Sequence, residues 1–77
     1  MKISDITEEV LGAEIRMYEY LGNAWSIDVK SAEKTNQLHV GDKFKYKKYV
    51  YEIKRIAFVK ATIDYFNFAC FQVGEAE

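Results

Sequence analysis

Residues 43–53 constrain the fold most, because apolar and charged side chains nearly alternate along them. Successive side chains of a β-strand point to opposite faces, so this pattern is typical of strands with one buried and one exposed face. Gly41-Asp42 is a turn signal before the segment, and Lys47-Lys48 interrupts the alternation. We therefore predict two antiparallel strands folded at Lys47-Lys48. This turn has no glycine, so either a lysine adopts a positive φ or the loop is longer than two residues.

Three other segments have the character of strands. Residues 25–29 (Trp-Ser-Ile-Asp-Val) alternate cleanly, and residues 56–59 continue the second strand of the hairpin. After a weak turn at residues 60–62, residues 63–73 form an apolar run that we expect to be the last strand. The polar residues 31–37 are the longest loop that we expect.

The N-terminal part is ambiguous between a long helix and a shorter one. Asp5 and Glu8 have the spacing of a capping box, so we expect a short helical segment to begin here. Apolar residues between 6 and 21 lie at helical spacing, and Gly22 would end the longer helix. Gly12 in the middle of that stretch opposes a long helix by about 1 kcal/mol.

A β-hairpin is the alternative to the long helix. Gly22-Asn23 has the form of a two-residue hairpin turn. On one side of it, residues 15–21 hold the aromatic and β-branched side chains that a partner strand for residues 25–29 would use. We favour the hairpin, and the long helix stays open as the alternative.

These segments predict a mainly β fold. Five strands in about seventy residues suit a small five-stranded antiparallel barrel, SH3-like or OB-like, with a short N-terminal helix. The alternative is an α+β roll with one helix packed on an antiparallel sheet. The sequence has no proline, low-complexity tract or repeat, so we expect residues 1–77 to be a single small domain. A chain this short buries only roughly 60% of its unfolded surface, and a homodimer would supply more burial.

The hairpin segment also carries a resemblance. Its two parts, Val40-Gly41-Asp42-Lys43-Phe44-Lys45-Tyr46 and Tyr51-Glu52-Ile53, resemble the paired strands of many small barrels, including those of bacteriophage head-tail joining proteins. The resemblance covers under a quarter of the chain, and the glycine usual in the intervening turn is missing. It implies a small barrel and, as one alternative, a phage structural role of the head-tail joining type, but it transfers no functional residue.

The counts of reactive residues argue against catalysis and metal binding. Cys70 is the one cysteine and His39 the one histidine, so a single chain can build neither a disulfide nor a Cys/His zinc site. The four glycines are scattered and form no phosphate-binding loop, and no pair of carboxylates stands out. We therefore expect no enzyme, no cofactor and no metal. We read His39 as a surface or capping residue.

The location of the protein follows from the same features. Cys70 lies in an apolar run and reads as a buried, inert thiol in a reducing compartment. The N-terminus lacks the pattern of a secretory signal, and polar residues interrupt every long apolar stretch. We expect a cytoplasmic protein that does not interact with a membrane.

Charge is unevenly distributed along the chain. Residues 43–60 hold seven Lys or Arg against one acid, a net charge of +6, whereas residues 1–42 carry −4 and residues 61–77 carry −3. Tyrosines lie among these basic residues, and small barrels bind single-stranded nucleic acid with such a combination. The alternative is that the lysines protect an exposed strand from aggregation while the aromatic side chains form the core. The candidate binding residues are Lys43, Lys45, Tyr46, Lys47, Lys48, Tyr49, Tyr51 and Arg55.

The function that we favour from the sequence is a non-enzymatic protein-interaction module. It would bind a protein partner through the aromatic-lysine surface or an exposed strand edge, and its size is typical of accessory or inhibitor proteins encoded by phages and mobile elements. Nucleic-acid binding through the basic, tyrosine-rich hairpin is the second hypothesis. We expect a protein partner first, nucleic acid second, and leave homo-oligomerisation open. We assign Trp25 to the core rather than to a binding hot spot.

Overall fold

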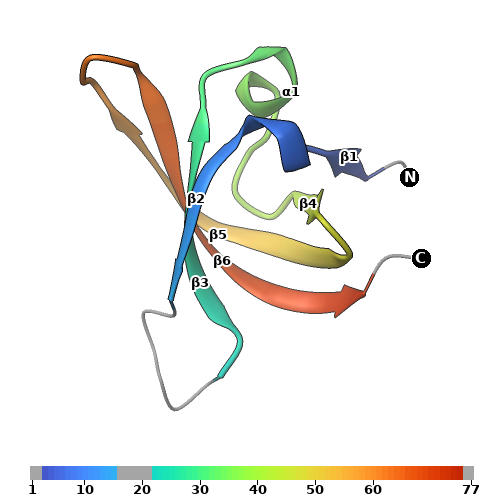
Figure 1. Ribbon diagram of the computed structural model, residues 1–77. Helices are drawn as coiled ribbons and strands as arrows, with labels where there is room; N and C mark the ends of the chain where they lie inside the picture. Colours follow the sequence, from blue (N-terminus) through green and yellow to red (C-terminus); the bar gives the residue numbers. More distant parts are fainter. Residues whose placement is uncertain (1–2, 16–21, 76–77) are drawn as a thin grey trace.

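The computed structural model describes residues 3–15 and 22–75. Its elements follow one another as β1 (Ser4–Asp5), the 3-10 turn η1 (Thr7–Glu9), β2 (Val10–Ile15), β3 (Ala24–Lys30), α1 (Glu33–Asn36), β4 (Lys43–Tyr46), β5 (Tyr49–Val59) and β6 (Tyr65–Glu75). The strands form one sheet in the order β1-β4-β5-β6-β3-β2. Figure 1 shows that this sheet curls into a half-barrel.

The mainly β class is confirmed, but the sheet differs from the predicted five-stranded antiparallel barrel. In the described residues it has six strands, and it is mixed because β1 runs parallel to β4 with Ser4 opposite Phe44. β1 lies at one edge of the sheet and β2 at the other, so the segment between them crosses from edge to edge (Figure 1). A strand of two residues is too short to show a periodicity, and for this reason the sequence pattern did not reveal β1.

The predicted N-terminal helix is wrong, because this segment forms only the 3-10 turn η1. The Asp5 carboxylate accepts hydrogen bonds from the backbone N–H of Thr7 at 3.0 Å and from its hydroxyl at 2.6 Å. The carboxylate therefore closes a local turn from Asp5 to Thr7. No side chain caps the N-terminus of η1, and a longer helix beginning here would have uncapped N–H groups. Ile6 is fully buried, and Val10 is already extended, with φ −74° and ψ 126°.

The stretch predicted as the longest loop contains the single-turn helix α1. Thr35, which is only 2% exposed, holds this turn in place. Its hydroxyl accepts a hydrogen bond from the backbone N–H of Ala32 at 2.9 Å and donates one to the carbonyl of Lys30 at 2.9 Å. The predicted loop at residues 31–37 therefore contains one helical turn, which the buried Thr35 stabilises.

The preference for a hairpin over a long helix is confirmed in the described residues. β2 pairs antiparallel with β3, but it begins at Val10, earlier than the predicted start at residue 15. Ile15 lies opposite Trp25, a register that is not centred on Gly22-Asn23. Residues 16–21, which we had assigned to the partner strand, lie outside the described residues. The expected strand at residues 25–29 is confirmed as β3.

The hairpin of β4 and β5 is confirmed where the sequence placed it. Tyr46 lies opposite Tyr49, so the turn consists of Lys47 and Lys48. Lys47 adopts a positive φ (57°), which was one of the two alternatives that the missing glycine left open. β5 continues to Val59, as expected, and the last strand begins at Tyr65, two residues later than predicted.

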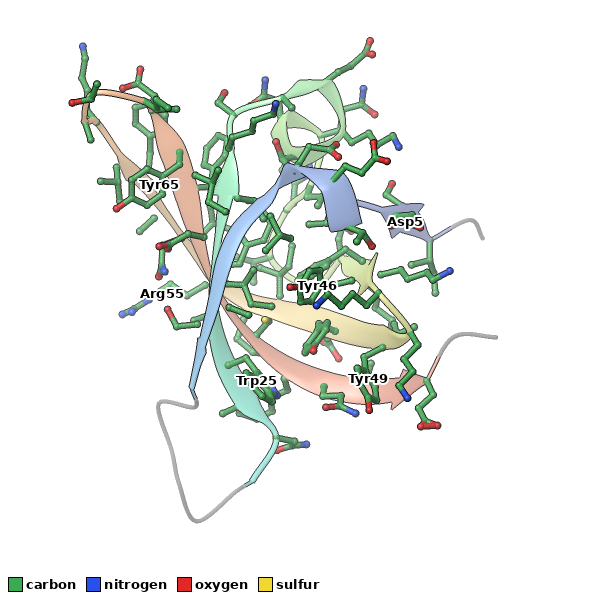
Figure 2. All side chains as sticks on the ribbon, in the orientation of Figure 1. Asp5, Trp25, Tyr46, Tyr49, Arg55 and Tyr65 are labelled. Carbon is green, nitrogen blue, oxygen red and sulfur yellow. The ribbon has the colours of Figure 1, made fainter. Side chains whose placement is uncertain are left out.

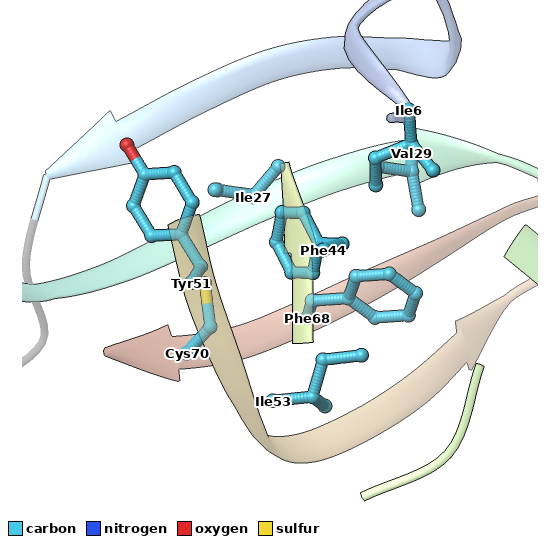
Figure 3. Packing of buried hydrophobic residues seen from close by; sticks show 8 residues of the cluster. All are labelled: Ile6, Ile27, Val29, Phe44, Tyr51, Ile53, Phe68 and Cys70. Atoms are coloured by element: carbon cyan, nitrogen blue, oxygen red, sulfur yellow. The ribbon is translucent and has the colours of Figure 1, made fainter. Parts of the chain in front are cut away.

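The core lies inside the curl of the sheet, as Figure 3 shows. Its buried members are Ile6, Ile27, Val29, Phe44, Tyr51, Ile53, Phe68 and Cys70. Partly buried side chains pack against them, and these include Trp25, in agreement with the core role that we assigned to it. The expected burial of Cys70 is also confirmed, and burial raises the pKa of its thiol to about 12.

Candidate interaction surface

The eight candidate binding residues do not share one face of the molecule. Tyr51 is only 4% exposed and belongs to the core, so it presents no surface to a partner. Figure 2 shows Arg55 well away from Tyr46 and Tyr49. A single aromatic and basic surface made of all eight residues is therefore not what the fold builds.

Two of the lysines belong to β4, where they flank the buried Phe44. Because side chains alternate along a strand, Lys43 and Lys45 project from the face opposite to Phe44. Lys45 is partly covered and its Nζ lies 3.9 Å from Oδ2 of Asp5 in β1. Lys43 and Lys45 therefore share a face, but an acid lies beside one of them.

The other two lysines form the turn between β4 and β5. The Nζ of Lys47 lies 5.3 Å from the ring centroid of Tyr46, and the Nζ of Lys48 lies 5.6 Å from that of Tyr49. Both tyrosines are half-buried and pack against the core. A lysine therefore lies near each of these partly buried rings, which reduces the ring surface available for stacking on a base.

Arg55 is separated from this hairpin by an irregularity in β5. The pairing of β5 with β6 shifts between Ile53 and Arg55, as a β-bulge does. Lys54 beside the bulge folds back, with its Nζ 3.3 Å from Oε2 of Glu52 and 5.7 Å from the ring centroid of Phe71. Arg55 is exposed and forms no ion pair with any described residue.

Beyond the bulge, β5 and β6 continue as a hairpin that we call the distal arm, residues 54–67. Figure 1 shows that its end projects away from α1 and β1. Phe58 is 55% exposed on β5, and Ile63 is 63% exposed in the connecting turn. Two large apolar side chains are therefore presented to solvent on one projecting element.

Phe58 is nevertheless held firmly, because aromatic rings connect it to the core. Its ring centroid lies 5.4 Å from that of Phe66, which lies 6.2 Å from that of Phe68. The Phe68 ring lies 5.6 Å from the ring of the buried Phe44. Such contacts stabilise an aromatic side chain beyond its burial, so the exposed ring occupies a defined position.

The backbone of β5 is paired on one side only along the distal arm. β4 pairs with β5 as far as Glu52, and the N–H and C=O of Ile53 then bond at 2.9 Å to the C=O of Asp42 and the N–H of Gly41. From residue 55 to 59, β5 pairs with β6, and between residues 54 and 59 nothing in the described chain pairs with its other side. We call residues 54–59, seen from this side, the open β5 edge.

β2 forms another edge of the sheet, since it is last in the strand order. Leu11 on this strand is 52% exposed. Gly12 and Ala13, which follow it, carry little or no side chain.

Near β1 and the loop before β4, an open depression of about 500 Å³ is lined by residues that include Leu38, Asp42 and Lys43. Its one carboxylate, Asp42, accepts a hydrogen bond from the backbone N–H of His39 at 2.9 Å. His39 is exposed and thus has the surface position that we expected. In residues 3–15 and 22–75, no group of three His, Cys, Asp or Glu side chains is placed to hold a metal ion.

Comparison with known proteins gives no relative. No protein-family model, curated protein or solved structure matches this chain. The function must therefore be argued from the surface itself. None of the helices in the described part of the chain is long and apolar enough to span a membrane.

Proposed function

We propose that this chain is a non-enzymatic protein-interaction module of the cytoplasm, and that the distal arm is its contact surface. The observation that carries the proposal is the exposure of Phe58 and Ile63 on one projecting hairpin. Large apolar side chains exposed on one projecting element favour a protein contact, and aromatic residues are enriched among those that dominate binding energy.

The packing of Phe58 supports the same proposal. A side chain that is already fixed by Phe66 loses little conformational entropy when a partner covers it. Arg55 and Lys60 are also exposed on the distal arm, and interfaces usually combine an apolar centre with polar residues at the border. The arm thus combines an ordered aromatic centre with charges at its border.

This proposal changes the surface predicted from the sequence. Lys43, Lys45, Lys47 and Lys48 lie on or near the β4–β5 turn, and two of them cover tyrosine rings there. Of the predicted residues, Arg55 alone lies on the distal arm. The curled, six-stranded half-barrel provides the scaffold from which the arm projects.

The test is affinity capture from an extract of the host, with the wild-type chain and two variants. Phe58→Ser combined with Ile63→Ser removes the apolar centre of the arm, and Val73→Ser is the matched control, because Val73 is 47% exposed on β6 outside the arm. We expect the wild type and Val73→Ser to retain the same protein and the arm variant to lose it, with nuclease treatment making no difference.

All three proteins should unfold at nearly the same urea concentration, since substitutions of exposed residues usually change stability by about 0.5 kcal/mol or less. Capture of nucleic acid alone, or capture that is equal for all three proteins, would contradict the proposal.

A further inference from the structure

We infer that the open β5 edge binds an extended peptide segment with alternating apolar and acidic side chains, which adds to the sheet as a strand beside residues 54–59. This inference rests on the proposed function and specifies the mode of binding. It names a partner chemistry, a position on the fold and a backbone contribution that the proposed function alone does not require.

The backbone gives the first reason. Strand pairing on the β4 side of β5 ends at Ile53, whose N–H and C=O both have partners. Beyond Ile53 the strand stays extended because β6 holds it, with Ala57 opposite Asn67 and Val59 opposite Tyr65. An extended strand with unpaired N–H and C=O groups on one side is a template for a further strand.

The side chains on the two faces of this edge give the second reason. Ile56 packs against the core cluster and Phe58 contacts Phe66, so both point to the inner face. By alternation, Arg55 and Ala57 belong to the outer face. A strand laid beside them would place apolar side chains next to Ile56 and Phe58 and acidic ones next to Arg55, which has no acid beside it in the described chain.

The charge of the edge decides against a second copy of this chain as its occupant. Between residues 53 and 63 there are three basic residues, Lys54, Arg55 and Lys60, and no acidic one. An antiparallel pair of identical edges centred on Ala57 would place Lys54 opposite Lys60 twice. Like charges directly opposite one another destabilise strand pairing, so the edge disfavours its own copy and favours an acidic segment.

The experiment uses two fluorescent peptides of about seven residues, the usual strand length. One alternates valine with glutamate and the other alternates valine with lysine. Fluorescence anisotropy measures their binding to the full chain at low and high salt, and amide hydrogen exchange followed by NMR measures protection at residues 54–59. We expect the glutamate peptide to bind and the lysine peptide not to bind. The amide hydrogens of Ile56 and Phe58 should exchange more slowly once the glutamate peptide is added.

Charge variants then locate the contact. Arg55→Glu should weaken binding of the glutamate peptide by about fivefold to tenfold, because it replaces a favourable cross-strand pair by a repulsive one. Lys48→Glu changes the net charge equally at the β4–β5 turn and should weaken binding by less than about twofold at high salt, where distant charges are screened. Arg55 is exposed, so both variants should fold.

Several results would overturn the inference. These are equal binding of both peptides, equal losses in Arg55→Glu and Lys48→Glu, unchanged exchange at residues 54–59, or self-association of the chain through this edge in sedimentation. If neither peptide binds while affinity capture still depends on Phe58, strand addition is wrong and the proposed function stands. If capture does not depend on Phe58 either, both are wrong.

Discussion

Replacing Tyr51 with alanine separates a core role from a surface role for this residue. The alternating pattern placed Tyr51 among the binding residues, whereas the fold leaves only 4% of it exposed. Its ring stacks on that of Phe44 at 5.4 Å between centroids and meets the ring of Trp25 edge-on at 6.4 Å. Removing a large aromatic side chain from such a site costs about 3–5 kcal/mol, through lost burial and the cavity that remains.

That cost is large for a domain of this size. At about 0.05–0.15 kcal/mol per residue, 77 residues give a free energy of unfolding of roughly 4–12 kcal/mol. Tyr51→Ala should therefore lower the midpoint of urea unfolding severely, and Tyr49→Ala, at a half-buried position of the same strand, should lower it much less. Trp25 is the single tryptophan, and its fluorescence reports the transition. Equal midpoints for the two variants would refute the core assignment.

The pH dependence provides a second test of the same burial. Desolvation raises the pKa of Tyr51 from its ordinary 10.0 to about 12. The unfolded chain then ionises first, so the contribution to stability is complete below pH 10 and is lost as the pH rises from 10 to 12. Tyr51→Phe has no hydroxyl to ionise and should lose less stability over this interval than the wild type. Parallel curves for the two proteins would contradict this desolvation of Tyr51.

Three further predictions concern the β4–β5 turn and its neighbour Asp5. In urea unfolding, Lys47→Gly should be more stable than Lys48→Gly by about 1 kcal/mol. Both variants lose a cation–π contact, but only position 47 has a left-handed backbone (φ 57°), which glycine adopts without strain. Hydrogen bonds from Thr7, and then the charge of Lys45, lower the pKa of Asp5 below its ordinary 3.8. The stability that these contacts give is present above pH 3.8 and is lost as the pH falls through the lowered pKa. Asp5→Asn has no carboxyl to protonate, so its stability should change less than that of the wild type in acid unfolding experiments. Single-stranded oligonucleotides should not bind measurably at low salt, and salt-sensitive binding that Lys45→Glu with Lys47→Glu abolishes would restore the nucleic-acid hypothesis.

The sequence predicted the hairpin of β4 and β5 well because one rule decides it. In residues 43–46 the apolar side chains face the core and the lysines face outward, as strict alternation predicts. The alternation breaks at Lys47-Lys48, and this break marks the turn in which Lys47 has a positive φ. β1 could not be predicted in this way, because its two residues carry no period. Its partner β4 lies far along the chain, with Ser4 opposite Phe44, so no local pattern specifies the pairing.

The candidate surface was predicted less well, and the bulge in β5 is the physical reason why Arg55 lies apart from the other candidates. An inserted residue reverses which side chains face inward, so a pattern read through residues 53–56 assigns faces wrongly beyond it. The adjacent charges of Lys54 and Arg55 interrupt the alternation and are the signal that was available. Exposure of Phe58 had no such signal, because an apolar residue in a strand reads the same whether or not another strand covers it.

The exposure of the distal arm is the feature that folding alone explains least. Burying a phenylalanine or isoleucine side chain fully contributes about 1.5–3 kcal/mol, and a chain of 77 residues has little stability to forgo. One exposed apolar residue on a protein surface is ordinary. Here Phe58 and Ile63 lie on the same hairpin, Phe58 stands beside unpaired backbone, and its ring is ordered by Phe66. A partner strand would cover the ring and satisfy the backbone at once, so one binding event accounts for both features.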